Sequence, residues 1–329
     1  MAWGYLVVVC GFWILLYRGD SFLPATFFLF GPRYFLLAPL LLLIPLCFFR
    51  HSLLLPLGVA ALIILLPIMG FNLPHLSSLL SGGGHNTATP LIRIMTQNSE
   101  ARPLNVPFLR DLMERLELDL LAVQECNTAY INLDEQKKMP ILGFYFHVGS
   151  GNCLLSRFPI KKANPLDNKD VQKMGGSAQI VLYDLDFRGT TISLLNLHFD
   201  TPRWGLNAVI DEKFAGIPQL KSNIALRRWE SQLARQWSHH ASGPMLIVGD
   251  FNMPVESAIY REFWSDFTNV FSDSGVGYGF TRPLEYWGSR IDHILAGPGF
   301  AVETVSLSAD FDSDHLGVIA ELRLIPQTP

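Results

Sequence analysis

Asp250 and Asn252 are the residues whose types and spacing point most directly to chemistry. They follow residues 246–248, a short apolar run typical of a buried strand, and Gly249, which frees the backbone. In extended backbone, a spacing of two puts both side chains on one face. A carboxylate and a carboxamide there can hold a water and a phosphoryl oxygen, or one side of a hard metal site. A local Asp-Phe-Asn turn is the alternative explanation.

Polar side chains of the same kinds stand at the ends of other predicted strands. These clusters, built around amides, carboxylates and histidines, are residues 97–100, 124–125, 196–198, 250–252, 290–293 and 313–315. Any one of them could be an ordinary turn. Because active sites on sheets gather at strand ends, six such clusters indicate one shared site.

The residue types indicate which chemistry this site performs. Carboxylates and amides without cysteine or a closely spaced histidine pair suit a hard ion, Mg²⁺ or Mn²⁺, rather than structural zinc. His198 and His315 suit proton transfer or stabilisation of charge on a phosphate. The sequence contains no Walker-type phosphate loop and no Gly-x-Ser-x-Gly motif, which argues against an NTPase and an α/β-hydrolase.

The elements that must position these residues alternate in type. Helices are predicted at 104–116, 128–137, 219–237 and 257–264. Strands are predicted at 91–96, 120–123, 144–148, 152–156, 179–186, 191–197, 245–248, 291–296, 302–307 and 317–324, with an irregular stretch before residue 219. Strands outnumber the interspersed helices, so the pattern predicts sheets packed on each other with helices outside, a mixed α+β sandwich.

Seven motifs in this order resemble the endonuclease/exonuclease/phosphatase superfamily. They are Asn98, Gln124-Glu125, residues 155–160, 196–198, 249–252, 290–294 and 313–315. The resemblance spans about residues 91–325. It implies a four-layer α/β/β/α sandwich and a metal-dependent phosphoesterase, in which water attacks a phosphodiester or phosphomonoester in line.

For the metal, the resemblance implies that Glu125 is the principal Mg²⁺ ligand, with Asn98 beside it and Asp314 near the ion. Mn²⁺ is the alternative ion. Two positions depart from the usual pattern, because Gln97 replaces the common aromatic residue before Asn98, and Glu100 stands where some members have aspartate. These departures concern the metal geometry and leave the reaction class unchanged.

For catalysis, the resemblance implies that Asp250 positions or deprotonates the attacking water and that Asn252 holds a phosphate oxygen. His198 would contact the phosphate or protonate the leaving group. His315, oriented by Asp292, would stabilise the phosphorane-like transition state, since preorganised charge is the expected dominant catalytic term.

The first 75 residues differ from the rest of the chain in charge and apolar composition. Their charged side chains are Arg18, Asp20, Arg33 and Arg50, a net of +2, so the rest of a chain of net charge −4 carries −6. Apolar blocks at 2–17, 34–49 and 52–71 predict three transmembrane helices. A signal peptide could explain the first block alone, and buried soluble helices are the alternative for each.

The sequence therefore predicts three regions: a membrane domain at 1–75, a Gly/Ser-rich linker at 76–90 and a hydrolase domain at 91–329. Positive charges near the block ends lean toward a cytoplasmic hydrolase domain. The arrangement also resembles a bacterial subgroup in which the loop at residues 30–34 faces outward. On that resemblance we expect a multi-pass inner-membrane protein with an extracytoplasmic hydrolase domain.

The substrate class stays open at this stage. A domain of charge −6 lacks the basic surface of nucleic-acid binders, which argues against the hypothesis of a nuclease. A phospholipid head group or a small phosphoester fits a domain held at a bilayer. A catalytically inactive membrane scaffold is the alternative from another class. Nothing in the sequence predicts a protein partner.

Two further observations have open alternatives. Cys126 and Cys153 could form a disulfide in an oxidising compartment, or they could be buried free thiols. Trp204, Arg282 and Trp287, together with Arg203, could form a substrate rim near the motif residues, or they could be surface Trp–Arg stacks.

Overall fold

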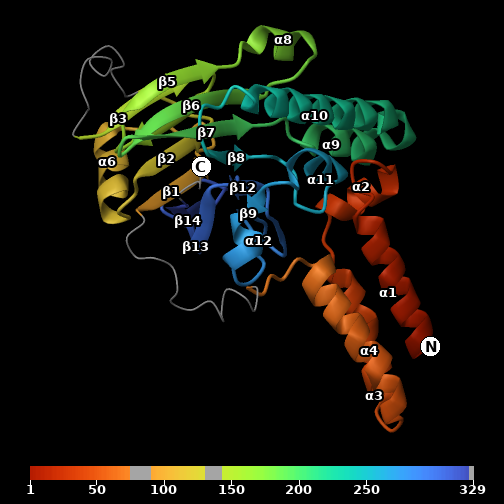
Figure 1. Cartoon of the computed structure of the whole chain (residues 1–329). Helices are drawn as coiled ribbons and strands as arrows, with labels where there is room; N and C mark the ends of the chain where they lie inside the picture. The colour runs from red at the N-terminus through yellow and green to blue at the C-terminus, as the bar shows by residue number, and fades with distance from the viewer. Residues whose placement is uncertain (75–89, 130–142, 326–329) are drawn as a thin grey trace.

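The chain consists of a helical part and a layered sandwich, which contact each other (Figure 1). The structure is a computed structural model that describes residues 1–74, 90–129 and 143–325. We call residues 1–74 the helical module and residues 90–325 the sandwich domain. The predicted linker lies almost entirely outside the described residues, as does the helix predicted at 128–137.

Two six-stranded sheets form the centre of the sandwich domain. The first has the strand order β13-β14-β1-β2-β4-β3, and the second β5-β6-β7-β8-β12-β9. The strands of the first sheet are β1 (Leu91–Asn98), β2 (Leu120–Gln124), β3 (Tyr145–Gly149), β4 (Asn152–Ser156), β13 (Phe300–Ser308) and β14 (Gly317–Leu324). Those of the second are β5 (Ile160–Pro165), β6 (Gln179–Phe187), β7 (Thr190–His198), β8 (Met245–Asp250), β9 (Thr268–Asn269) and β12 (Asp292–Ala296). A short hairpin, β10 (Arg282–Pro283) and β11 (Gly288–Ser289), stands apart from both.

Three apolar clusters show the order of the layers. Alternate residues of both sheets, such as Ile94 and Leu194, form the cluster between them. The outer face of the first sheet packs on α6 (Val106–Arg115), and that of the second packs on α10 (Ile217–Ser238) and α11 (Ala258–Trp264). The order is helix, sheet, sheet, helix, which agrees with the predicted sandwich.

Most predicted strands and helices lie within two residues of their observed bounds. The stretch before residue 219 was predicted to be irregular, and this prediction was wrong, because α9 (Arg203–Glu212) occupies much of it. Only Gly205 of α9 is buried, and the Pro202 and Gly205 at its start are residues typical of turns. The smaller helices α8 (Asn168–Lys173) and α12 (Val270–Ser274) and the 3-10 turn η3 (Lys213–Gly216) also belong to this domain.

The helical module projects from the sandwich, with the N-terminus toward its outer end (Figure 1). Its elements are α1 (Ala2–Leu16), α2 (Leu23–Phe30), η1 (Tyr34–Leu37), α3 (Ala38–Cys47), α4 (His51–Ile63) and the π-helical turn η2 (Ile64–Ile68). In the described residues, one helix, His51–Ile68, is long and apolar enough to cross a membrane. The three predicted transmembrane helices are therefore not seen as three full-length spans, since α1 has 15 residues and α2 bends by 85° against Tyr34–Cys47.

The module and the sandwich domain are joined by specific polar contacts. Asp20, between α1 and α2, forms an ion pair of 2.5 Å with Arg227 on α10, and both side chains are fully buried. Ser257 donates to the other Asp20 oxygen over 2.6 Å. Asn72 exchanges two backbone hydrogen bonds with Gly277. One end of the module is thus fixed to the sandwich at more than one place.

Candidate active site

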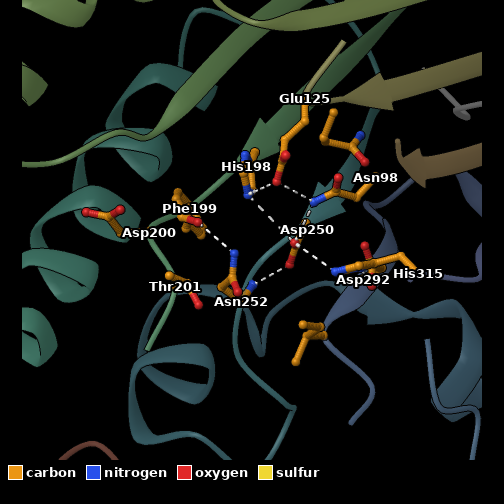
Figure 2. A network of polar contacts seen from close by, with 12 residues as sticks. Asn98, Glu125, His198, Phe199, Asp200, Thr201, Asp250, Asn252, Asp292 and His315 are labelled. Carbon is orange, nitrogen blue, oxygen red and sulfur yellow. Dashed lines mark hydrogen bonds and ion pairs between the residues drawn. The ribbon is translucent and has the colours of Figure 1, made fainter. Parts of the chain in front are cut away.

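The pairing of the strands brings the predicted residues together. β1 and β2 run parallel with Asn98 opposite Gln124, and β7 and β8 run parallel with His198 opposite Asp250. Antiparallel β12 then sets Asp292 opposite Asp250. The polar residues therefore lie at neighbouring strand ends of both sheets, as Figure 2 shows.

Unusual backbone conformations direct these side chains into the site. Glu125 and Asn252 both have φ of +50°, a left-handed conformation that costs energy in a non-glycine residue. Gly249 has φ of +136°, and a Cβ there would lie 1.8 Å from the Leu197 carbonyl oxygen. Only glycine permits β7 and β8 to approach so closely just before Asp250.

Asp250 is the centre of the cluster. Its Oδ2 accepts a hydrogen bond of 3.0 Å from Asn98 Nδ2 and lies 3.7 Å from His198 Nε2. Its Oδ1 accepts from the backbone nitrogen of Asn252 over 2.8 Å. Burial, followed by the charge of Asp292, raises the pKa of the Asp250 carboxyl above its usual range. A carboxylate held in this way is fixed in direction and has increased basicity.

Glu125 shares the donors of Asp250. Asn98 Nδ2 donates to Glu125 Oε1 over 3.1 Å, and His198 Nε2 lies 3.6 Å from the same oxygen. Asn252 Nδ2 donates to the Phe199 carbonyl oxygen over 2.8 Å (Figure 2). The two carboxylates thus converge on one amide and one imidazole.

His315 is oriented from the other side by Asp292. Its Nδ1 lies 2.9 Å from Asp292 Oδ2, and its Nε2 lies 4.0 Å from Asp250 Oδ2. Burial lowers the pKa of His315, but the negative charges of Asp292, Asp250 and Asp314 outweigh this effect and raise the pKa to about 9. These negative charges favour the protonated imidazole, whose Nε2 lies 4.0 Å from Asp250 Oδ2 and 3.1 Å from Arg282 Nη1.

The cluster lies in a cavity of about 610 Å³. Arg282, from the β10–β11 hairpin, lies with Nη1 3.1 Å from His315 Nε2 and pairs with Asp314 over 2.5 Å. Trp204 on α9 lines the cavity and is 72% exposed. Arg282 and Trp204, which the sequence offered as rim residues, do line it, whereas Trp287 does not and belongs to a neighbouring cavity described below.

Phe30 of the helical module also lines this cavity. The Arg227 guanidinium stacks over its ring at 5.4 Å, which connects the buried Asp20–Arg227 pair to the cavity wall. Sequence reasoning missed this residue. Phe30 is one phenylalanine among several in an apolar run, and no local signal distinguishes it.

The donor set fits a hard divalent cation. Carboxylate oxygens of Glu125 and Asp250 converge within reach of Asn98, and oxygen ligands of this kind are the ones that a hard divalent cation prefers. Among the described residues, the buried Asp292 Oδ1 has no hydrogen-bond partner, as expected of an oxygen reserved for a ligand. Asp314, predicted near the metal, has a 39% exposed side chain and contacts Arg282.

Cys126 and Cys153 form a disulfide, with their Cα atoms 5.7 Å apart. This resolves the alternative left open by the sequence. The bond ties the residue after Glu125 to β4 and so restrains the turn that carries that carboxylate.

The comparisons with known proteins agree with this geometry. The model of the endonuclease/exonuclease/phosphatase family matches residues 104–315. The chain belongs to this family. A search of curated proteins found no match.

Solved structures share the fold at low sequence identity. An endonuclease/exonuclease/phosphatase from Bacteroides vulgatus has a TM-score of 0.53 and 17% identity, covering 71% of this chain and 99% of its own. One from Beutenbergia cavernae has a TM-score of 0.52 and 17% identity, covering 71% and 72%. D. rerio TDP2 complexed with a single-strand DNA product has a TM-score of 0.51 and 16% identity, covering 70% and 98%. All three share the two-sheet fold.

Proposed function

We propose that this protein is a membrane-anchored, divalent-metal-dependent phosphoesterase. The convergence of Asn98, Glu125, His198, Asp250 and the Asp292–His315 pair on one cavity carries the proposal. Family membership supports a hydrolase of phosphoester bonds.

The reaction uses the chain's own residues in a fixed order. Asp250 orients a water molecule and accepts its proton while the water oxygen bonds to phosphorus. Protonated His315 and the Arg282 guanidinium donate to phosphate oxygens as negative charge develops. Asn252 holds a third oxygen, and His198 supplies a proton to the leaving alcohol as the old P–O bond breaks. Asp292 keeps the His315 ring in position.

The carboxylates of Glu125 and, at the rim, Asp314 would hold the cation, Mg²⁺ or Mn²⁺, beside Asn98. When bound, the ion supplies Lewis-acid stabilisation of charge on the phosphoryl oxygens. The preference for oxygen ligands supports these ions over zinc.

Several features support insertion of the module into a bilayer. Only 28% of the residues of the His51–Ile68 helix are buried, unlike a soluble core helix. Large apolar side chains are exposed along the module, among them Leu41 at 78%, Leu42 at 72% and Phe49 at 90%. A surface of this kind is stable in lipid and unstable in water.

For the side of the membrane, the count of positive charges near the helix ends differs by a single arginine and carries little weight. The Cys126–Cys153 disulfide supports an oxidising compartment. We therefore place the hydrolase domain outside the cytoplasm, on an inner membrane.

One experiment tests the activity. The full chain in non-ionic detergent is offered bis(p-nitrophenyl) phosphate, DNA, RNA, phospholipids and inositol phosphates, with Mg²⁺ or EDTA, beside a His315→Ala variant. We expect metal-dependent hydrolysis that the variant loses. Turnover that persists in EDTA or in the variant would reject the assignment.

A further inference from the structure

A second cavity, of about 240 Å³, lies between the helical module and the sandwich domain. We call it the seam pocket. Apolar and aromatic side chains from both parts line it, including Leu29, Tyr34, Met69, Phe280, Tyr286 and Trp287. An apolar cavity of roughly 150 Å³ is already large enough to bind benzene. The seam pocket therefore has the size and lining for part of an apolar ligand.

The seam pocket and the catalytic cavity share a wall. Ser289 lines both of them. On the module side, Phe30 faces the catalytic cavity, while its neighbours Leu29 and Gly31 face the seam pocket. The two cavities are therefore adjacent, and an extended ligand that passes Ser289 would occupy both.

Two buried donors in the lining of the seam pocket are unused. Among the described residues, neither Trp287 Nε1 nor Arg290 Nη1 has a hydrogen-bond partner. The other terminal nitrogen of Arg290 donates to Ser272 Oγ over 3.1 Å. Arg33 is different, since its pairing with Glu256 and two carbonyls satisfies it. Because unpaired buried donors are unfavourable, the lining favours a ligand with acceptor oxygens beside its apolar part.

We propose that the seam pocket holds the first part of the hydrocarbon chain of a lipid-linked phosphoester whose phosphate occupies the catalytic cavity. The linkage oxygens accept hydrogen bonds from Trp287 and Arg290. The remaining chain leaves past Tyr34 and Tyr286, which are 41% and 70% exposed, toward the apolar surface of the module. Tyrosines of this kind are favoured at a membrane–water boundary. The inference rests on the proposed phosphoesterase activity and names its substrate class.

A competition experiment tests chain recognition. The full chain in non-ionic detergent hydrolyses bis(p-nitrophenyl) phosphate while ethyl phosphate or hexadecyl phosphate competes. We expect hexadecyl phosphate to inhibit at a concentration at least about tenfold lower, because each buried methylene adds binding energy. In Met69→Trp, which fills the seam pocket, this ratio should fall toward one. The matched control, Leu62→Trp on the exposed side of α4, should keep the ratio.

Equal inhibition by the two phosphates, or a ratio unchanged in Met69→Trp, would overturn the inference and favour a soluble phosphoester or nucleic acid. A second measurement needs no activity. Hexadecyl phosphate with bromine on its chain quenches nearby tryptophan. Trp3 and Trp13 are exposed on the module and are quenched from the micelle in either protein, so we expect the wild type to be quenched more than Trp287→Phe by the share of that one indole. Identical quenching in both proteins would also reject the inference. Quenching without hydrolysis would keep the pocket and reject the phosphoesterase.

Discussion

The buried ion pair between Asp20 and Arg227 predicts a large effect for a substitution far from the active site. In Asp20→Asn, the Arg227 charge stays buried without a counter-charge, because Ser257 and Asn223 offer only neutral groups. Removing one partner of a buried pair costs about 3–5 kcal/mol, against about 5–15 kcal/mol for a whole protein. At roughly 2–4 °C per kcal/mol for a domain of this size, the apparent Tm should fall by about 6–20 °C.

The assay is thermal unfolding of the full chain in non-ionic detergent, followed by tryptophan fluorescence. Asp20→Asn and Arg227→Met are compared singly and together. Since the double variant buries no charge, it should recover much of the loss, which gives a strong coupling in the double-mutant cycle. Additive effects below about 1 kcal/mol each, the size typical of exposed pairs, would refute the reasoning.

Three further predictions concern the site and its support. Asp250→Asn should lower kcat by about 10²–10⁴ without loss of Tm, since the buried charge that it removes is disfavoured; a normal kcat or a fall in Tm would contradict this. Glu125→Gln should raise the Mg²⁺ concentration for half-maximal activity by roughly tenfold or more; an unchanged metal titration would remove it as principal ligand. Glu230 accepts from the backbone nitrogens of Ala178 and Asp200, and burial raises its pKa to about 7. This pKa lies above the unfolded value of 4.5, so the protonated Glu230 stabilises the fold fully below pH 4.5. That stabilisation, on the order of 3 kcal/mol, is lost as the pH rises through 7. Urea titrations of Glu230→Gln should lack this pH dependence, and pH profiles identical to those of the wild type would refute the prediction.

The strand-end residues could be predicted because their positions follow from local patterns. Each β-branched or apolar run predicts a strand, and the polar residue after it must lie at that strand's end. Parallel pairing then puts Asn98 beside Gln124 and His198 beside Asp250. Pairing within each sheet sets these neighbours, and the packing of the two sheets face to face then brings Asn98 to Asp250. This is why the eight predicted site residues all lie at or beside one cavity.

Other features depend on contacts that leave no local trace. Asp20 and Arg227 are 207 residues apart, and each looks in sequence like an ordinary charged residue. The contribution of Phe30 to the catalytic cavity depends on how the module docks, which apolar composition does not specify. The disulfide likewise depends on the antiparallel pairing of β2 and β4, which brings Cys153 opposite Val123, three residues before Cys126. The amino-acid composition alone could not predict whether the Cys126–Cys153 disulfide forms.

The buried pair also constrains how the protein is made. Synthesis produces Asp20 long before Arg227, and until α10 folds the carboxylate lacks its cation. Under the proposed membrane insertion, a lone carboxylate within hydrocarbon is costly, so the corner between α1 and α2 would lie in water or among lipid head groups. Closure of the sandwich domain onto that corner would then follow synthesis of residue 227. A nascent chain arrested before residue 227 would leave this corner accessible from the aqueous side.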